Sequence, residues 1–312
     1  MNYVDLKTEF LSVTYNNVTY SKEFYAPAIS VTGVLNENHP SWNATTAYTV
    51  DEYVIIPELK SIYRCSVNNT GKFPVGNLNS WTFWGYLNSV NMFACDENIG
   101  SKTIGIDVIV TLPFSQSNTL GIVDTDFSFV NIKQINNDTS EEVVNFTTSS
   151  RDISCGSFAE YSYKPVDHKR KVIVDNLEWL PNSNLVITFI GSCKIGTIGR
   201  GLIQDLGMTM LGTSLEWETK SKIKVDEFTN FRTVLRYGKV RVLTVQLIFN
   251  IDEFNRTANK IDTILDKNIL FVPTNQDKFS ELITIAYMEK FKIPLDNPHT
   301  IQTTTTLIGV SN

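Results

Sequence analysis

Residues 239–250, KVRVLTVQLIFN, read as a strand with apolar side chains on both of its faces. Val240 and Val242 lie on one face, and Leu243, Val245 and Leu247 alternate with them on the other. Since successive side chains of a strand point to opposite sides of a sheet, a strand of this kind must be covered twice. We therefore expect a central strand that lies beneath a second sheet or a partner.

Further strands are expected wherever runs of Val, Ile, Thr and Phe end at Gly, Asn or Pro. Two sheets packed face to face are a common way to cover such strands. The sequence therefore predicts a mainly β protein with β-sandwich-type domains. The clearest of the other runs lie at residues 103–112, 170–177 and 184–191.

One helix is predicted at residues 254–268, FNRTANKIDTILDKN. Its apolar side chains recur at helical spacing and so share one face, and Asp252 is available as the N-cap. We expect this face to pack on a sheet. The residues that form it are Phe254, Ala258, Ile261 and Leu265.

Charge and hydropathy argue against two classes of partner. The net charge is −6 and the isoelectric point is about 5.2, so the clustered Lys and Arg that neutralise nucleic-acid phosphates are missing. The one basic cluster, HKRK at 168–171, is expected to be an exposed hairpin end. No run of about 18 apolar residues and no basic leader before an apolar run occurs. We predict no nucleic-acid partner, no membrane insertion and no secretory signal.

The residues that commonly bind metals lack the required spacing. Cys65, Cys95, Cys155 and Cys193 form no C-x-x-C pair, and we expect them to be buried as small apolar residues. The Asp residues of VDTD, 123–126, are not followed by the spacing of a calcium loop. We predict no metal and no cofactor.

No pattern in the sequence indicates catalysis. His39, His168 and His299 are expected in turns, and no serine lies in a G-x-S-x-G motif. The acidic pairs Glu141–Glu142 and Asp226–Glu227 are adjacent, so the two side chains of a pair point to opposite faces of a strand. We assign no catalytic residue and predict that the chain is not an enzyme.

The segment 42–84, WNATTAYTVDEYVIIPELKSIYRCSVNNTGKFPVGNLNSWTFW, holds three of the five tryptophans. Rings in a small β module either fill its core and its protein contacts or stack on a ligand, and both interpretations remain open. Trp42 and Tyr48 are expected to be structural, because a module of this size has little other apolar mass. The candidate ligand-binding residues are Tyr63, Trp81 and Trp84, with Asn68 and Asn69 to hydrogen-bond hydroxyl groups.

The order of residues in this segment is also informative. It runs Trp42, Ala47-Tyr48-Thr49, Val54, Ile62-Tyr63-Arg64-Cys65, Gly71, Pro74, Trp81 and Trp84. This order resembles the small carbohydrate-binding modules appended to chitinases. The resemblance implies a few short antiparallel strands with rings inside and outside, and a glycan ligand. It departs at residues 56–61, where the family has a short turn that contains Gly or Asn.

A second pattern covers residues 193–312. A glycine-rich run precedes an Asp-Glu-Phe turn, a long strand, the helix, the segment ILFVPTN and two closing strands. This order is similar to a recurrent domain of tailed-bacteriophage structural proteins, in which a chitinase-type module often lies upstream. The matching positions are Gly199, Gly207, Thr209, Gly212, Asp226, Glu227 and Phe228, whereas Asn230 stands where the family has glycine.

The two resemblances divide the chain into four segments. These are an N-terminal arm (1–35), a domain like a carbohydrate-binding module (36–92), a β-sandwich domain (93–192) and a phage-type β domain with one helix (193–312). They imply a non-enzymatic virion protein of the tail, collar or baseplate region, assembled in the host cytoplasm. Its expected partners are other virion proteins, copies of itself in a ring or other symmetric assembly, and host surface carbohydrate. The alternative is a carbohydrate-active enzyme, a glycoside hydrolase with an appended binding module.

Overall fold

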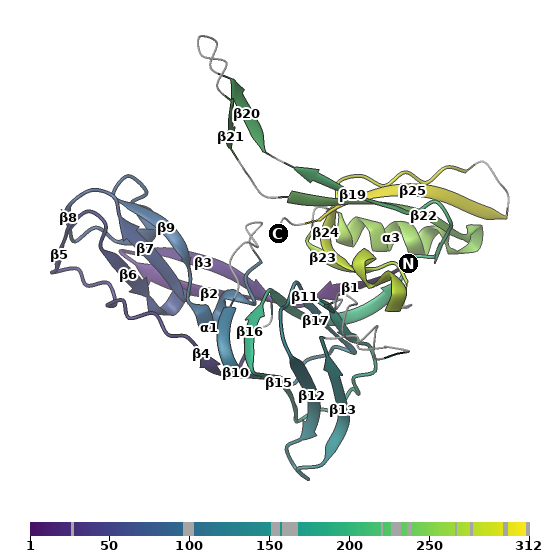
Figure 1. The fold of residues 1–312 in the computed structure, drawn as a ribbon, viewed down its shortest axis with the longest axis horizontal. Coiled ribbons are helices and arrows are strands. Elements are labelled where there is room, and N and C mark those ends of the chain that lie inside the picture. Colours follow the sequence, from purple (N-terminus) through teal and green to yellow (C-terminus); the bar gives the residue numbers. More distant parts are fainter. Residues whose placement is uncertain are drawn as a thin grey trace.

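The computed structural model describes residues 1–25, 28–95, 103–150, 157, 168–219, 221–225, 232–235, 239–265, 267–274, 277–295 and 299–309. The fold is mainly β, as the sequence predicts, and is built from antiparallel ladders (Figure 1). The largest sheet has ten strands. In spatial order they are β14 (Val172–Val174), β11 (Thr119–Val123), β17 (Thr197–Asp205), β1 (Asn2–Leu6), β23 (Ile269–Val272), β24 (Thr284–Met288), β25 (Thr300–Gly309), β22 (Lys239–Asn250) and β18 (Met208–Thr209), with β19 (Ser214–Thr219) also on β22.

A six-stranded sheet packs against one part of this large sheet. Leu120 and Ile122 of β11 meet Val130 of β12 and Ile187 of β15 in one buried core, which is the predicted sandwich. The strands of the second sheet are β13 (Glu142–Ser149), β12 (Phe129–Asn136), β15 (Ser183–Ile190), β10 (Thr103–Leu112) and β16 (Ser192–Ile195), with β4 (Ser30–Val34) on β10.

The helix α3 (Phe254–Ile264) covers another part of the ten-stranded sheet. Its buried residues are Thr257, Ile261 and Ile264, so the apolar face lies close to where the sequence placed it, although the helix is shorter than predicted. The N-cap prediction was wrong: Asp252 is exposed, and Asn250 caps the preceding 3-10 turn η3 (Ile251–Glu253) by accepting from the amide of Asp252.

Strand β22 is covered less completely than the sequence suggested. Leu243, Val245 and Leu247 are fully buried toward α3, whereas Val242 and Ile248 on the opposite face are only partly buried. The reason is that α3 covers one face alone.

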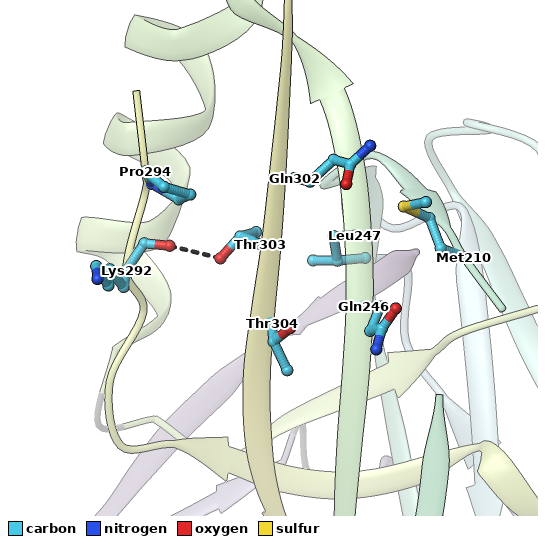
Figure 2. Close-up of a pocket in the computed structure, with 8 residues that line it drawn as sticks. All are labelled: Met210, Gln246, Leu247, Lys292, Pro294, Gln302, Thr303 and Thr304. Atoms are coloured by element: carbon cyan, nitrogen blue, oxygen red, sulfur yellow. Dashed lines mark hydrogen bonds between the residues drawn. The ribbon is translucent and has the colours of Figure 1, made fainter. Parts of the chain in front are cut away.

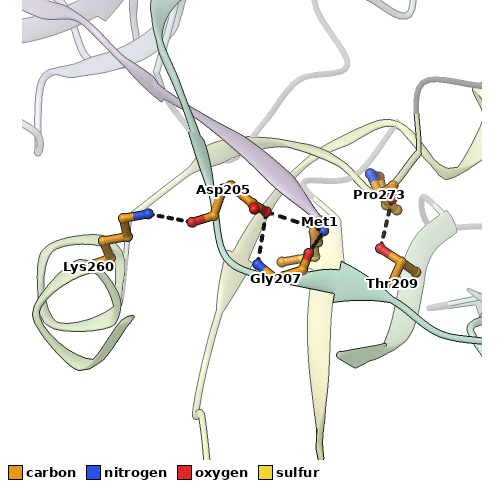
Figure 3. Close-up of polar contacts among 6 residues, drawn as sticks. All are labelled: Met1, Asp205, Gly207, Thr209, Lys260 and Pro273. Atoms are coloured by element: carbon orange, nitrogen blue, oxygen red, sulfur yellow. Dashed lines mark hydrogen bonds and ion pairs between the residues drawn. The ribbon is translucent and has the colours of Figure 1, made fainter. Parts of the chain in front are cut away.

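The first residues of the expected N-terminal arm lie inside the large sheet. Strand β1 lies inside the large sheet, paired with β17 on one side and β23 on the other. Its side chains alternate between two cores, with Tyr3 in one and Val4 and Leu6 in the other. Figure 3 shows the junction at its start, where Asp205 contacts the amino group of Met1 and accepts from the amide of Gly207 at 2.9 Å.

The aromatic module consists of very short strands and is joined to the body partly through the hairpin β2 (Thr8–Tyr15) and β3 (Val18–Tyr25). Its sheets are β5 (Ala47–Tyr48) with β8 (Asn69–Thr70), and β6 (Tyr53–Ile56), β7 (Ser61–Cys65) and β9 (Trp81–Tyr86). Its helical turns are η1 (Pro57–Leu59), η2 (Pro74–Gly76) and α1 (Asn88–Asn91). The turn η1 occupies the segment 56–61, and Lys60 supplies the positive φ of 49° that ends it.

The boundary expected at residue 193 does not separate the sheets. Strand β16 belongs to the six-stranded sheet and β17 to the ten-stranded sheet, but β11 and β14 from the preceding segment also join the larger sheet. A second hairpin, β20 (Lys222–Val225) with β21 (Arg232–Leu235), projects away from the rest of the fold (Figure 1). The remaining helical turn is η4 (Asp277–Leu282).

Candidate functional site

Two of the three predicted ligand-binding rings lie in the core of the aromatic module. Trp81 is 0% exposed and Tyr63 is 2% exposed, and both belong to one cluster with Val54 and Phe73. The indole Nε1 of Trp81 donates to the carbonyl of Lys72 at 3.0 Å. This corrects the assignment of Tyr63 and Trp81, because neither ring has a free face for a ligand.

The two rings expected to be structural also pack inside the module. Tyr48 is buried edge-on against Trp81, with 5.2 Å between ring centroids, and its hydroxyl accepts from the amide of Asn43 at 2.7 Å. Trp42 is half-buried. Its indole Nε1 is buried with no hydrogen-bond partner among the described residues.

The two candidate amides hold loops of the module. Asn68 is exposed, and its Oδ1 accepts from the amide of Val50 at 2.8 Å. Asn69 is buried, and its Nδ2 donates to the carbonyl of Val67 at 2.9 Å. Asn69 is therefore a structural residue rather than a ligand-binding one, and Asn68 has its carbonyl oxygen engaged.

Trp84 is the one predicted ligand-binding ring that is exposed, at 57%. It forms a surface with Tyr53, His39 and Arg64, which we name the open aromatic surface. The ring of Tyr53 meets Trp84 edge-on at 5.3 Å, and His39 stacks on Tyr53 at 5.1 Å. The guanidinium of Arg64 lies 5.9 Å from the centroid of Trp84 and donates from Nε to Asp51 at 2.8 Å.

Three members of this surface, His39, Tyr53 and Arg64, could not be identified from the sequence, because they meet Trp84 through pairing between strands and through the stack of His39 on Tyr53. Tyr53 and Arg64 are directly opposite each other on β6 and β7, and Thr82 of β9 follows Arg64 in register. Alternation along each strand places these residues on the face opposite the module core. An exposed indole backed by a cation can stack on the C–H face of a sugar, and the neighbouring charged groups can bond hydroxyls.

A second group of rings on the module is covered by the hairpin β2–β3. We name Tyr15, Tyr20, Trp42 and Phe73 the covered aromatic surface. Tyr15 stacks on Phe73 with 4.5 Å between centroids and meets Trp42 edge-on at 5.4 Å. Tyr20 adds a tilted contact with Phe73 at 5.8 Å. These contacts attach the hairpin to the module through rings.

Besides the end strands β14 and β18, strand β19 and part of β25 have a ladder partner on one side only among the described residues of the large sheet. Strand β19 pairs with β22 alone, and residues 300–306 of β25 pair only with β22 because β24 reaches no further than Leu307. Beside this part of β25, the segment around Lys292 is joined through the hydroxyl of Thr303, which donates to the Lys292 carbonyl (Figure 2).

The outer face next to this edge is polar and slightly hollowed. A depression of about 370 Å³ lies over β25 and β22 (Figure 2). Gln246 and Thr304 are opposite each other in register on its floor, and Gln302 is exposed beside them. Backbone and amide groups here can bond an extended chain.

Two reactive groups outside the module, the amine of Lys171 and the thiol of Cys193, are buried in the fold. Lys171 was expected to be exposed with the rest of HKRK but is only 4% exposed, and its Nζ donates to the carbonyl of Glu281 at 2.9 Å. Burial, with Arg241 nearby, lowers the pKa of Lys171 to about 8. Burial raises the pKa of the Cys193 thiol to about 11, so this cysteine is unreactive near neutral pH.

The acidic pairs give no catalytic arrangement among the described residues. Glu141 and Glu142 are exposed, and Glu142 pairs with Lys133. Asp226 and Glu227, like Cys155, lie outside the described residues. Within the part of the chain that the structure describes, no group of three or more His, Cys, Asp or Glu side chains could hold a metal ion.

No protein-family model, no curated protein and no solved structure matches this chain. Among the described residues, none of the helices has the length and apolar character needed to cross a membrane.

Proposed function

We propose that this chain is a non-enzymatic structural protein of a tailed-bacteriophage virion, located in the tail, collar or baseplate region and docked onto further copies of itself. The observation that carries the proposal is that β19 and residues 300–306 of β25 have, among the described residues, no second strand paired in a ladder, although side-chain hydrogen bonds join the segment at 290–292 to β25. Unpaired edges recruit other strands unless they are blocked. The pattern of residues 193–312, similar to a domain of phage structural proteins, supports the virion setting.

The charges beside the two edges are complementary. Glu216 and Glu218 are exposed on β19, whereas Lys290 and Lys292 are exposed beside the open part of β25. The β19 edge of one copy therefore suits the β25 edge of the next. A head-to-tail contact of this kind closes into a ring when the rotation between copies permits.

Charge reversal tests this docking. Mass photometry of the full chain is expected to show oligomers in the wild type. When Lys290 and Lys292 are both changed to Glu, these oligomers are expected to dissociate at a higher protein concentration than those of the wild type. The pair Glu216→Lys and Glu218→Lys has the same effect, and combining all four changes restores assembly because the attraction is re-formed with opposite signs. Arg256→Glu, an exposed reversal on α3, is the matched control. A monomer at all concentrations, or equal assembly in every variant, contradicts the docking.

We further propose that the open aromatic surface contacts host glycan. Trp84 offers an exposed indole, and many copies in one particle multiply a weak single-site affinity. The four residues come from three strands and the segment before them, so the backbone fixes their spacing.

A glycan array tests the surface. Wild type is expected to bind a defined saccharide class, and Trp84→Ala to lose about tenfold or more in affinity, as stacking contacts are worth about 1 to 2 kcal/mol. Trp179→Ala removes a tryptophan that is 71% exposed outside the module and serves as the control. Equal binding by Trp84→Ala and Trp179→Ala contradicts the assignment of Trp84. Hydrolysis of a bound saccharide favours the glycoside hydrolase alternative.

A further inference from the structure

A positive charge lies in the interior of the sandwich. Arg200 is in the buried first part of β17, opposite Leu120 of β11, and is only 3% exposed. On one side lies the apolar core that both sheets form, which includes Leu120 and Leu185, and on the other lie polar residues such as Gln134. A charge in such a place is costly unless it is paired.

The described residues do not provide Arg200 with a full set of partners. Its Nη1 donates to the carbonyl of Pro113, but its buried Nε has no hydrogen-bond partner. No carboxylate of the described residues lies within ion-pair distance of the guanidinium. Burial lowers the pKa of Arg200 to about 10, and Glu9 acts in the opposite direction, so the group stays charged at neutral pH.

A small cavity adjoins this guanidinium. It is lined by Arg200, Pro113, Ser115, Ser117 and Gln134 among others, and its volume is about 20 Å³. This is enough for one water or a single atom of similar size.

The polar groups around the cavity fall into two sets. Gln134 is saturated by its own neighbours: its Nε2 donates to the carbonyl of Glu178 at 2.7 Å, and its Oε1 accepts from the Glu178 amide at 3.0 Å. Ser115 and Ser117 are half-buried, and no hydrogen bond of either hydroxyl is found among the described residues. Two serines and a buried cation therefore line one small space.

We propose that this cavity binds one small monovalent anion of the size of chloride, which is the counter-ion of Arg200. A guanidinium N–H group and serine hydroxyl groups can each donate a hydrogen bond to an acceptor in the cavity. An anion is such an acceptor, and it also balances the buried positive charge. Two acidic residues act on or line this site, Glu9 and Glu178, and both are exposed. Neither carboxylate is desolvated with the guanidinium.

Halide dependence of unfolding tests the proposal. The full chain is melted in sodium chloride and in sodium gluconate at equal ionic strength, since gluconate is too large for the cavity. The Tm of wild type is expected to rise by about 5 °C when chloride reaches about 100 times its Kd. Arg200→Gln removes the charge, and its Tm is expected to be the same in both salts. A wild-type Tm that does not depend on the anion overturns the proposal.

Bromide diffraction gives a second readout that needs no variant. Crystals grown in sodium bromide are expected to show an anomalous peak beside Arg200 and the two serines, and its absence overturns the proposal. Ser117→Ala is expected to weaken the chloride effect with the fold intact. Glu9→Gln is expected to leave it unchanged, whereas a chloride effect that appears only in this variant identifies Glu9 as the native counter-ion and rejects the site.

Discussion

Two groups of rings lie at the outside of the aromatic module. One is covered by the hairpin β2–β3, and the other is open to solvent. The covered aromatic surface is closed by Tyr15, which stacks on Phe73 at 4.5 Å. The open aromatic surface has Trp84 more than half exposed, with Tyr53 and Arg64 in contact with its ring. Composition does not distinguish these groups. What distinguishes them is which face of the module the hairpin β2–β3 reaches.

The same contrast occurs between Trp81 and Trp84, three residues apart on one strand. Odd spacing places two side chains of a strand on opposite faces, so one indole fills the core and the other meets solvent. Grouping them as one ligand-binding pair ignored this alternation. The burial of β9, in which Trp81 is buried and Thr82 and Trp84 are exposed, follows it.

Truncating the two indoles separately gives the largest expected difference. Trp81→Ala removes a fully buried ring and its hydrogen bond to Lys72, and is expected to lower the free energy of unfolding by about 3 to 5 kcal/mol. Trp84→Ala is expected to change it by no more than about 0.5 kcal/mol. Urea unfolding followed by circular dichroism measures both. Similar losses for the two variants would break the distinction between the core ring and the surface ring.

A similar contrast between a buried and an exposed residue occurs in the HKRK cluster. Lys171 is buried, whereas His168 is exposed. The pKa of Lys171 is about 8 in the folded chain and about 10.4 when unfolded, so between these values the unfolded state binds more protons. Stability contributed by this group therefore rises with pH, by about 2 kcal/mol between pH 7.5 and 9.5.

The measurement is urea unfolding at both pH values for wild type and Lys171→Met. Met cannot titrate, so the difference in unfolding free energy between the two proteins is expected to shift in favour of wild type as the pH rises. A parallel pH dependence in the two proteins would show that another group is responsible.

Tyr15→Ala sharpens the comparison at the covered surface. It removes one stacked and one edge-on contact, and is expected to lower the free energy of unfolding by about 1 to 2 kcal/mol. Phe10→Ala, on the same strand but 66% exposed, is the control and is expected to be nearly neutral. Hydrogen exchange of the module amides then tests whether the loss is local. The exchange rate is expected to increase only for amides of the hairpin and of residues near Trp42 and Phe73.

The sequence was sufficient for the fold class because its evidence is local. The alternation in β22 and the helical spacing of Ile261 depend only on nearest neighbours along the chain, and both elements form. It was insufficient for residues 1–35, since β1 is central only through ladders with β17 and β23, more than 190 residues away. No local pattern in NYVDL distinguishes an inner strand from an extended arm.

The candidate site was predictable in part. Trp84 was identified, but Tyr53 and Arg64 join it through cross-strand register and His39 through its stack on Tyr53, and the sequence displays neither. The covered surface was not predictable, because Tyr15 reaches Trp42 and Phe73 through a hairpin that lies outside the module. Arg200 was also missed, since a single arginine within GTIGRG gives no indication that it is buried.

The central position of β1 has a consequence for the order of folding. During synthesis residues 2–6 emerge long before their two neighbouring strands, at 201–205 and 270–272. The large sheet therefore cannot close until residue 272 has been made, and pairings between such distant segments form slowly. Until then strand β1 is unpaired. During this interval its unpaired backbone and apolar side chains can associate with the wrong segment or with another chain.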